Sequence, residues 1–213
     1  MIVSYSIQTL AIGKVEHITK KDKTTHTAIS KSAVEKAYLS ETGFQGDEQA
    51  DLVHHGGPDK AVCAYSSEHY PYWEKKLQTK LSPAAFGENV TIAGLFESEI
   101  HLGDTFQLGE AIVQVSQPRQ PCFKLSLKHN EPKLPLWVRE TGYTGFYFRV
   151  LQPGWVTTED KLTFIRSVEG RISIAKVNEL LYEKEVNEEE VYAVLRLDVS
   201  AESLKEDLEK KLM

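Results

Sequence analysis

Apolar and polar residues alternate with a period of two in the clearest segments of the first 166 residues. This alternation predicts β-strands with one buried face, and it is clearest in residues 2–7 and 111–116. Turn signals such as Pro153-Gly154 separate the runs. Further short strands are expected at residues 10–15, 24–29, 61–65, 90–92, 105–107, 146–151 and 162–165. Many short strands with few helices between them predict a barrel-like β fold.

Helical periodicity dominates the end of the chain. Residues 173–185 carry apolar side chains at helical spacing, with Ser173 as a possible N-cap. Asn187 and Ser200 can cap two further helices, the first with Glu190 placed for a capping box. Because three short helices bury little surface alone, we expect them to pack together and against the barrel or a partner.

These patterns define a fold class and a division of the chain. The predicted fold is mainly β (α+β), with a β-barrel-like domain at residues 1–166 and a small three-helix domain at residues 167–213. One earlier helix is expected at residues 66–80. The lysines of residues 20–36 are expected on a solvated face, and Cys63, inside a short apolar strand, is expected in the core.

Composition narrows the functional classes. The net charge is −6, and the segment from Ser167 to Met213, with 12 acidic and 7 basic residues, carries −5 of it. No broad basic field favours a nucleic-acid polymer as partner. Two distant cysteines fit a reducing compartment. No signal peptide and no apolar run of roughly 20 residues is seen. We therefore expect a cytoplasmic protein without a membrane partner.

A cysteine lies beside two cations in the stretch Gln117-Pro118-Arg119-Gln120-Pro121-Cys122-Phe123-Lys124. The two prolines end strand pairing and extend the residues before them, which predicts a stiff loop at a strand end. Arg119 and Lys124 are near enough in sequence to stabilise a Cys122 thiolate or to hold an anion. A buried apolar cysteine is the alternative reading of the same residues.

A second unusual stretch is His54-His55-Gly56-Gly57-Pro58-Asp59-Lys60. Gly56 and Gly57 would let the backbone approach a ligand, and Asp59 and Lys60 offer an acceptor and a donor. Adjacent histidines in extended chain point in opposite directions, so a helical zinc pair is not favoured. A structural turn and a ligand loop both remain open here. A cysteine hydrolase that pairs Cys122 with His54 or His55 also remains open.

Five stretches, in this order, resemble the motifs of the MOSC domain, the C-terminal domain of molybdenum cofactor sulfurase, in its stand-alone bacterial YiiM-like form. They are Gly46-Asp47-Glu48-Gln49-Ala50-Asp51, His54-His55-Gly56-Gly57-Pro58-Asp59-Lys60-Ala61-Val62, Phe86-Gly87-Glu88-Asn89, Gln117 to Leu125, and Thr144 to Leu151. The C-terminal segment resembles the three-helix domain appended to these proteins. The resemblance covers nearly the whole chain.

The resemblance implies a molybdenum-cofactor enzyme that reduces N-hydroxylated compounds such as hydroxylaminopurine base analogues, a detoxification reaction. Cys122 matches the cysteine that ligates molybdenum, and a thiolate suits such a metal. The implied cofactor-binding residues are Arg119, Lys60, Gly56, Gly57, Asn89, Lys124 and Arg149, and the implied catalytic residues are Cys122, Asp59, His54 and His55. No iron–sulfur or flavin pattern is present, so an external electron-donating reductase is implied.

Two other functions fit the same sequence. A non-catalytic sulfur carrier would use Cys122 as a persulfide relay for metal–sulfur cofactor assembly. An interaction protein would use the acidic helical tail to contact a partner. The sequence also leaves a homodimer open.

Overall fold

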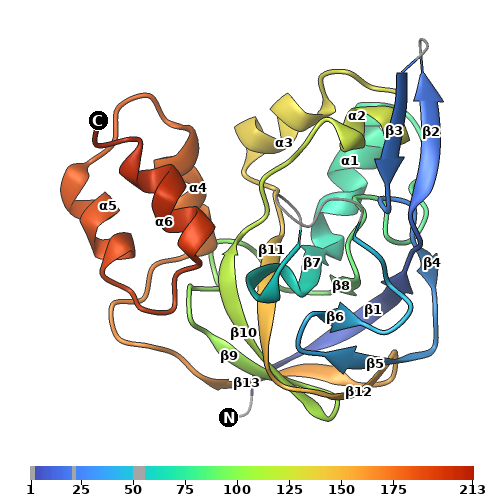
Figure 1. Cartoon of the computed structure of the whole chain (residues 1–213), viewed down its shortest axis with the longest axis horizontal. Coiled ribbons are helices and arrows are strands. Elements are labelled where there is room, and N and C mark those ends of the chain that lie inside the picture. The colour runs from blue at the N-terminus through green and yellow to red at the C-terminus, as the bar shows by residue number, and fades with distance from the viewer. Residues whose placement is uncertain (1–2, 21–22, 50–55) are drawn as a thin grey trace.

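The computed structural model describes residues 3–20, 23–49 and 56–213, and within them seven strands close into a β-barrel (Figure 1). Hydrogen bonding follows the order β13-β9-β10-β11-β7-β8-β1, and β1 pairs with β13 to close the sheet. Only β7 and β8 are parallel neighbours within this barrel. The strands are β1 (Ser4–Ile12), β7 (Val62–Ser66), β8 (Val90–Ile92), β9 (Thr105–Leu108), β10 (Ala111–Pro118), β11 (Phe146–Gln152) and β13 (Lys161–Arg166). The mainly β, barrel-like fold class is confirmed.

Short strands extend the barrel on one side. A sheet of order β12-β5-β6 and a separate hairpin of β2 and β3 lie beside it, and β4 pairs with the end of β1. These elements are β2 (Glu16–Lys20), β3 (Lys23–Thr27), β4 (Ser32–Ala33), β5 (Lys36–Ser40), β6 (Gly43–Phe44) and β12 (Gly154–Thr157). The strands of the polar segment near residues 20–36 therefore lie outside the seven-stranded barrel.

Strand β10 is buried on both faces, although its sequence alternates. Val113 and Val115 point into the core and have no exposed surface. On the other face Ser116 donates to the carbonyl oxygens of Asp59 (2.6 Å) and Tyr147 (3.1 Å). The alternation predicts a strand with one solvated face, but the turn at residues 58–60 covers that face.

A group of short helices covers one end of the barrel (Figure 1). Its core contains Tyr65, Trp73 and Phe86, and the indole of Trp73 donates to the Tyr65 hydroxyl (2.7 Å). Ser66 accepts from the Glu68 amide and starts the helical segment that the sequence predicts at 66–80. The elements are η1 (Pro58–Lys60), η2 (Ser67–His69), α1 (Tyr70–Leu77), α2 (Lys124–Lys128) and α3 (Leu134–Thr141).

Three helices follow the barrel: α4 (Ile174–Tyr182), α5 (Glu188–Leu195) and α6 (Glu202–Glu209). Ser173 and Asn187 cap the first two through their side chains, as the sequence predicts. Ser200 does not cap the third. The residue at that position is Ala201, and the Ser200 hydroxyl donates to the Val194 carbonyl instead (3.0 Å).

The three helices pack beside β9 and β10 and share one apolar core with the barrel (Figure 1). Val177 and Leu204 of the helices and Leu102 and Val115 of the barrel belong to the same buried cluster, and none has exposed surface. The proposed division into domains at residue 166 stays a prediction. Within the described residues, no helix is both long and apolar enough to span a membrane.

Candidate functional site

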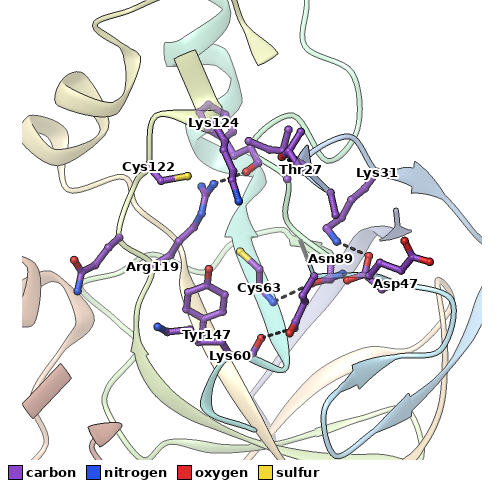
Figure 2. Close-up of a pocket in the computed structure, with 17 residues that line it drawn as sticks. Thr27, Lys31, Asp47, Lys60, Cys63, Asn89, Arg119, Cys122, Lys124 and Tyr147 are labelled. Atoms are coloured by element: carbon purple, nitrogen blue, oxygen red, sulfur yellow. Dashed lines mark hydrogen bonds and ion pairs between the residues drawn. The ribbon is translucent and has the colours of Figure 1, made fainter. Parts of the chain in front are cut away.

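A cleft lies where β10 leaves the barrel, and Cys122 stands on its wall (Figure 2). We call it the Cys122 cleft. It is lined by Thr27, Ala28, Ile29, Lys31, Asp47, Glu48, Gln49, Lys60, Cys63, Phe86, Gly87, Asn89, Arg119, Gln120, Cys122, Lys124 and Tyr147. Its volume is about 90 Å³, which is the space of a small group rather than of a whole pterin.

The cysteine loop runs from the end of β10 to the start of α2 and is held at several points. The Arg119 amide donates to the Gly145 carbonyl (3.0 Å), and the Cys122 carbonyl accepts from the Leu125 amide (3.1 Å). Gln120 donates to the Asp207 carboxylate of α6 (2.8 Å). Cys122 itself is partly exposed. The predicted placement at a strand end is confirmed, and α6 adds a support that the sequence gives no sign of.

Gly145 is required where this loop meets the barrel. Its φ is +70°, and a Cβ atom there would lie 2.4 Å from the Ala64 carbonyl oxygen. A side chain would therefore be strained and would also push β7 away from the loop that carries Arg119.

Arg119 is buried beside Cys122 with part of its guanidinium unpaired. The side chain is 6 % exposed, and its Nη2 donates to the Phe86 carbonyl (2.6 Å). Its Nη1 has no hydrogen-bond partner, and no carboxylate of the described residues lies within ion-pair distance of the guanidinium. A buried cationic donor without an acceptor is costly, so Nη1 favours an anionic group in the cleft. Figure 2 shows the Cys122 sulfur pointing toward this guanidinium.

A polar wall faces Arg119 across the cleft. Lys31 forms an ion pair with Asp47, and both side chains are 7 % exposed. The expectation of a solvated face is therefore wrong for Lys31, because the chain after β3 turns back over the barrel mouth. The Asp47 carboxylate also accepts from the backbone amide of Gly13 (2.7 Å) and from the side-chain Nδ2 of Asn89 (2.8 Å).

The Asn89 side chain links three segments beside this wall. Its Oδ1 accepts from the Cys63 amide (3.1 Å), and its Nδ2 donates to the Ala11 carbonyl (3.2 Å) as well as to Asp47. The side chain is 4 % exposed. Asn89 lines the cleft as the sequence suggested, but its bonding capacity is largely used within the protein.

Lys60, Lys124 and Tyr147 complete the lining around the cysteine. Lys124 begins α2, whereas Lys60 ends η1 and lines the cleft with its carbonyl, which accepts from Gln49 (3.4 Å), while its ammonium points away from Cys122 (Figure 2). Burial raises the pKa of the Tyr147 hydroxyl, which stays protonated near neutral pH. Sequence reasoning did not name Tyr147, because strand β11 showed apolar residues on both faces.

Other residues of the second stretch lie outside the lining. Asp59 accepts from Arg149 (2.7 Å), and Arg149 also donates to Gln114 (3.2 Å). This pair fastens η1 to β11 and β10 rather than facing Cys122. Gly57, with φ of +95°, precedes η1, and neither it nor Gly56 lines the cleft. His54 and His55 lie outside the described residues.

Cys63 is the second thiol of the cleft. It is 7 % exposed in β7, in agreement with the predicted core position. Burial raises the pKa of its thiol to about 11, and the nearby Arg119 opposes that shift only in part. Cys63 is therefore a neutral thiol at physiological pH.

The two cysteines are expected to differ in alkylation. Iodoacetamide at neutral pH should label the partly exposed Cys122 and leave Cys63 unmodified, because only a thiolate that the reagent can reach reacts. Peptide mass spectrometry would measure each site, with urea-unfolded protein as the control in which both are labelled. Equal labelling of the folded protein would contradict this assignment.

A zinc-type centre is not built by the described residues. No group of three or more histidine, cysteine, aspartate or glutamate side chains comes together there in a way that could hold a metal ion. Cys122 is the partly exposed thiol of this part of the chain. The cleft thus offers one soft ligand and a set of cations.

Comparisons with known proteins identify related sequences and a related fold. The sequence model of the MOSC domain matches residues 51–163. The protein YflK of Bacillus subtilis is 46% identical over 208 residues, which is 97% of this chain and 94% of YflK. The crystal structure of YiiM from Geobacillus stearothermophilus has a TM-score of 0.84 and 36% identity, covering 98% of this chain and 100% of that one. A Gibberella moniliformis protein named reductase is 30% identical over 154 residues, 70% of this chain but 27% of that protein.

Proposed function

Because the chain belongs to the MOSC domain family, we propose that it binds the molybdenum cofactor at the Cys122 cleft and reduces N-hydroxylated compounds. The family is associated with molybdenum cofactor sulfurase, and a relative is named a reductase. The observation that carries the proposal is the buried Arg119 Nη1, unpaired beside a partly exposed cysteine.

The donor set suits the metal-bearing, anionic end of that cofactor. A Cys122 thiolate is a soft ligand, and Arg119 presents an unused donor for a phosphate or oxo group. Lys124 adds positive charge to the same lining. The small volume of the cleft, about 90 Å³, limits this fit to the metal and its nearest groups.

The proposed reaction converts R–NHOH, two electrons and two protons into R–NH₂ and water. When bound, the cofactor would supply the two-electron redox chemistry for cleavage of the N–O bond. The protein positions the substrate and moves protons. Tyr147 lines the cleft with Cys122, and burial keeps its hydroxyl protonated, so it would orient the substrate as a hydrogen-bond donor. An external reductase provides the electrons.

Replacing Cys122 by serine is expected to abolish both bound molybdenum and turnover. The variant would be purified from a cofactor-producing host and compared with wild type by elemental analysis, by fluorescence of the oxidised pterin, and by reduction of hydroxylaminopurine with a chemical electron donor. A serine hydroxyl is not ionised at neutral pH and is a poor ligand for this metal.

The matched control is Cys63→Ala. It removes the other thiol of the cleft, which is neutral and buried, and should retain molybdenum. Full molybdenum content in Cys122→Ser, or equal loss in both variants, would refute the role of Cys122. A persulfide on Cys122 in protein that binds no pterin would favour the sulfur-carrier alternative.

A further inference from the structure

A second and larger cleft lies between α3 and α4. It has a volume of about 660 Å³, within the range of sites for small molecules. Its walls come from α3 and the segment after it, from residues 96–98, and from α4. We call it the α3–α4 cleft. None of its lining residues belongs to the Cys122 cleft.

One buried acceptor in this cleft lacks a donor. Asn178 of α4 is 4 % exposed, and its Nδ2 donates to Thr144 Oγ1 (2.8 Å) and to the Gly142 carbonyl (3.4 Å). The Thr144 hydroxyl donates its proton to the Gly145 carbonyl (2.9 Å), so both partners of Asn178 Nδ2 act as acceptors. This fixes the orientation of the Asn178 side-chain amide, with the nitrogen toward Thr144. Asn178 lines the cleft, and its buried Oδ1 is therefore an acceptor without a donor in the described part of the chain.

A second polar atom lies one helical turn further along the same face of α4. The Tyr182 hydroxyl is buried and has no hydrogen-bond partner among the described residues. Burial raises the pKa of this phenol to about 12, so it is neutral and can donate or accept. The Arg139 guanidinium lies 5.5 Å from the Tyr182 ring centre and leaves the hydroxyl end unpaired.

Flat rings and negative charge make up much of the remaining lining. Tyr143 stacks on His69 with 3.9 Å between ring centres. The His69 Nε2 lies within hydrogen-bond distance of the Glu97 carboxylate (2.7 Å). The exposed Phe96 and Leu136 add apolar surface at the mouth. Four glutamates line the cleft, Glu97, Glu140, Glu179 and Glu183, against one arginine. Glu97 contacts His69 and Glu179 pairs with Lys176 (2.8 Å), so the negative charge offered to a ligand comes mainly from Glu140 and Glu183. A ring with hydrogen-bond donors suits these walls better than an anion does.

We propose that the α3–α4 cleft binds a planar aromatic compound bearing an amine or amidine group, with an N–H of that group donating to Asn178 Oδ1. Tyr182 gives the ligand a second hydrogen bond, and the acidic lining favours its positive charge. This site is separate from the Cys122 cleft and does not depend on the function proposed there.

Benzamidine is the probe, and benzoate is its matched control, with the same ring but an anionic, acceptor-only group. Isothermal titration of the full chain is expected to give one benzamidine site, with benzoate at least about tenfold weaker. Tyr182→Phe, which removes only the unpaired hydroxyl, should weaken benzamidine about fivefold, and Asn178→Leu about tenfold or more. Cys122→Ser should bind benzamidine like wild type.

The substitutions make the result decisive. If Asn178→Leu fails to fold, Tyr182→Phe carries the test, because it keeps the ring and its packing. No benzamidine binding, equal affinity for benzoate, or wild-type affinity in Tyr182→Phe would overturn the proposal. Loss of benzamidine binding in Cys122→Ser would also overturn it, since the probe would then occupy the other cleft.

Discussion

Replacing Arg119 by methionine is expected to weaken anion binding at the Cys122 cleft by roughly 100-fold, the value of one or two charge-assisted hydrogen bonds. The guanidinium has one nitrogen committed to the Phe86 carbonyl and another, Nη1, without a partner. An anion in the cleft would receive that second donor and the full positive charge. Methionine fills similar volume and offers neither.

The same substitution should leave the ligand-free protein at least as stable as wild type. Losing the bond to the Phe86 carbonyl costs about 1–3 kcal/mol. Removing a buried charge that has no carboxylate partner returns a desolvation penalty of several kcal/mol. A residue whose removal weakens binding while sparing stability is retained for its ligand rather than for the fold.

Titration with inorganic phosphate and urea unfolding would measure the two effects. Arg119→Lys keeps the charge but not the two-pronged donor, so its affinity should fall between wild type and methionine. The matched control is Arg166→Met, because Arg166 is exposed at the end of β13 and should change neither quantity. Unchanged phosphate affinity in Arg119→Met, or a loss of stability above about 3 kcal/mol, would contradict this account.

The barrel could be predicted from local pattern, because strand alternation and turn residues act over a few positions. Strands β10 and β11 lie close to their predicted limits, as do the caps Ser173 and Asn187. Closure could not be predicted, since it depends on pairing between β1 and β13 across most of the chain. The helix cap at Ser200 was wrong by one position, because α6 begins at Glu202 with Ala201 at the capping position, and the Ser200 hydroxyl donates to the Val194 carbonyl.

Local sequence pattern predicts the candidate site only where residues are adjacent in sequence, and the resemblance to a family added Asn89 and Lys60 from distant segments. Cys122 and Arg119 share one loop, so their proximity follows from the chain itself. Lys31 and Tyr147 come from distant segments, and a charged residue in a polar stretch gives no local sign that it will be buried. Asp59 and Arg149 show the converse, because two plausible ligand-binding charges neutralise each other at 2.7 Å.

Deleting residues 167–213 is expected to prevent folding of the barrel rather than to detach an independent interaction module. Helices α4 and α6 bury Val177, Leu204 and Leu208 in the same cluster as barrel residues Leu102 and Val115. Without the helices those barrel side chains would meet water. The truncated chain should therefore be insoluble, or soluble without a cooperative unfolding transition, as judged by circular dichroism during heating.

A point substitution separates this role from a partner-binding role. Leu204→Ala should lower the free energy of unfolding by about 2–5 kcal/mol, because Leu204 has no exposed surface and the surrounding core cannot fully collapse. Glu206→Ala, two residues along the same helix and exposed, should change it by less than about 0.5 kcal/mol. A stable, cooperatively folding truncated chain, or equal effects of the two substitutions, would contradict a shared core. The acidic face of the helices would then be the better explanation for their presence.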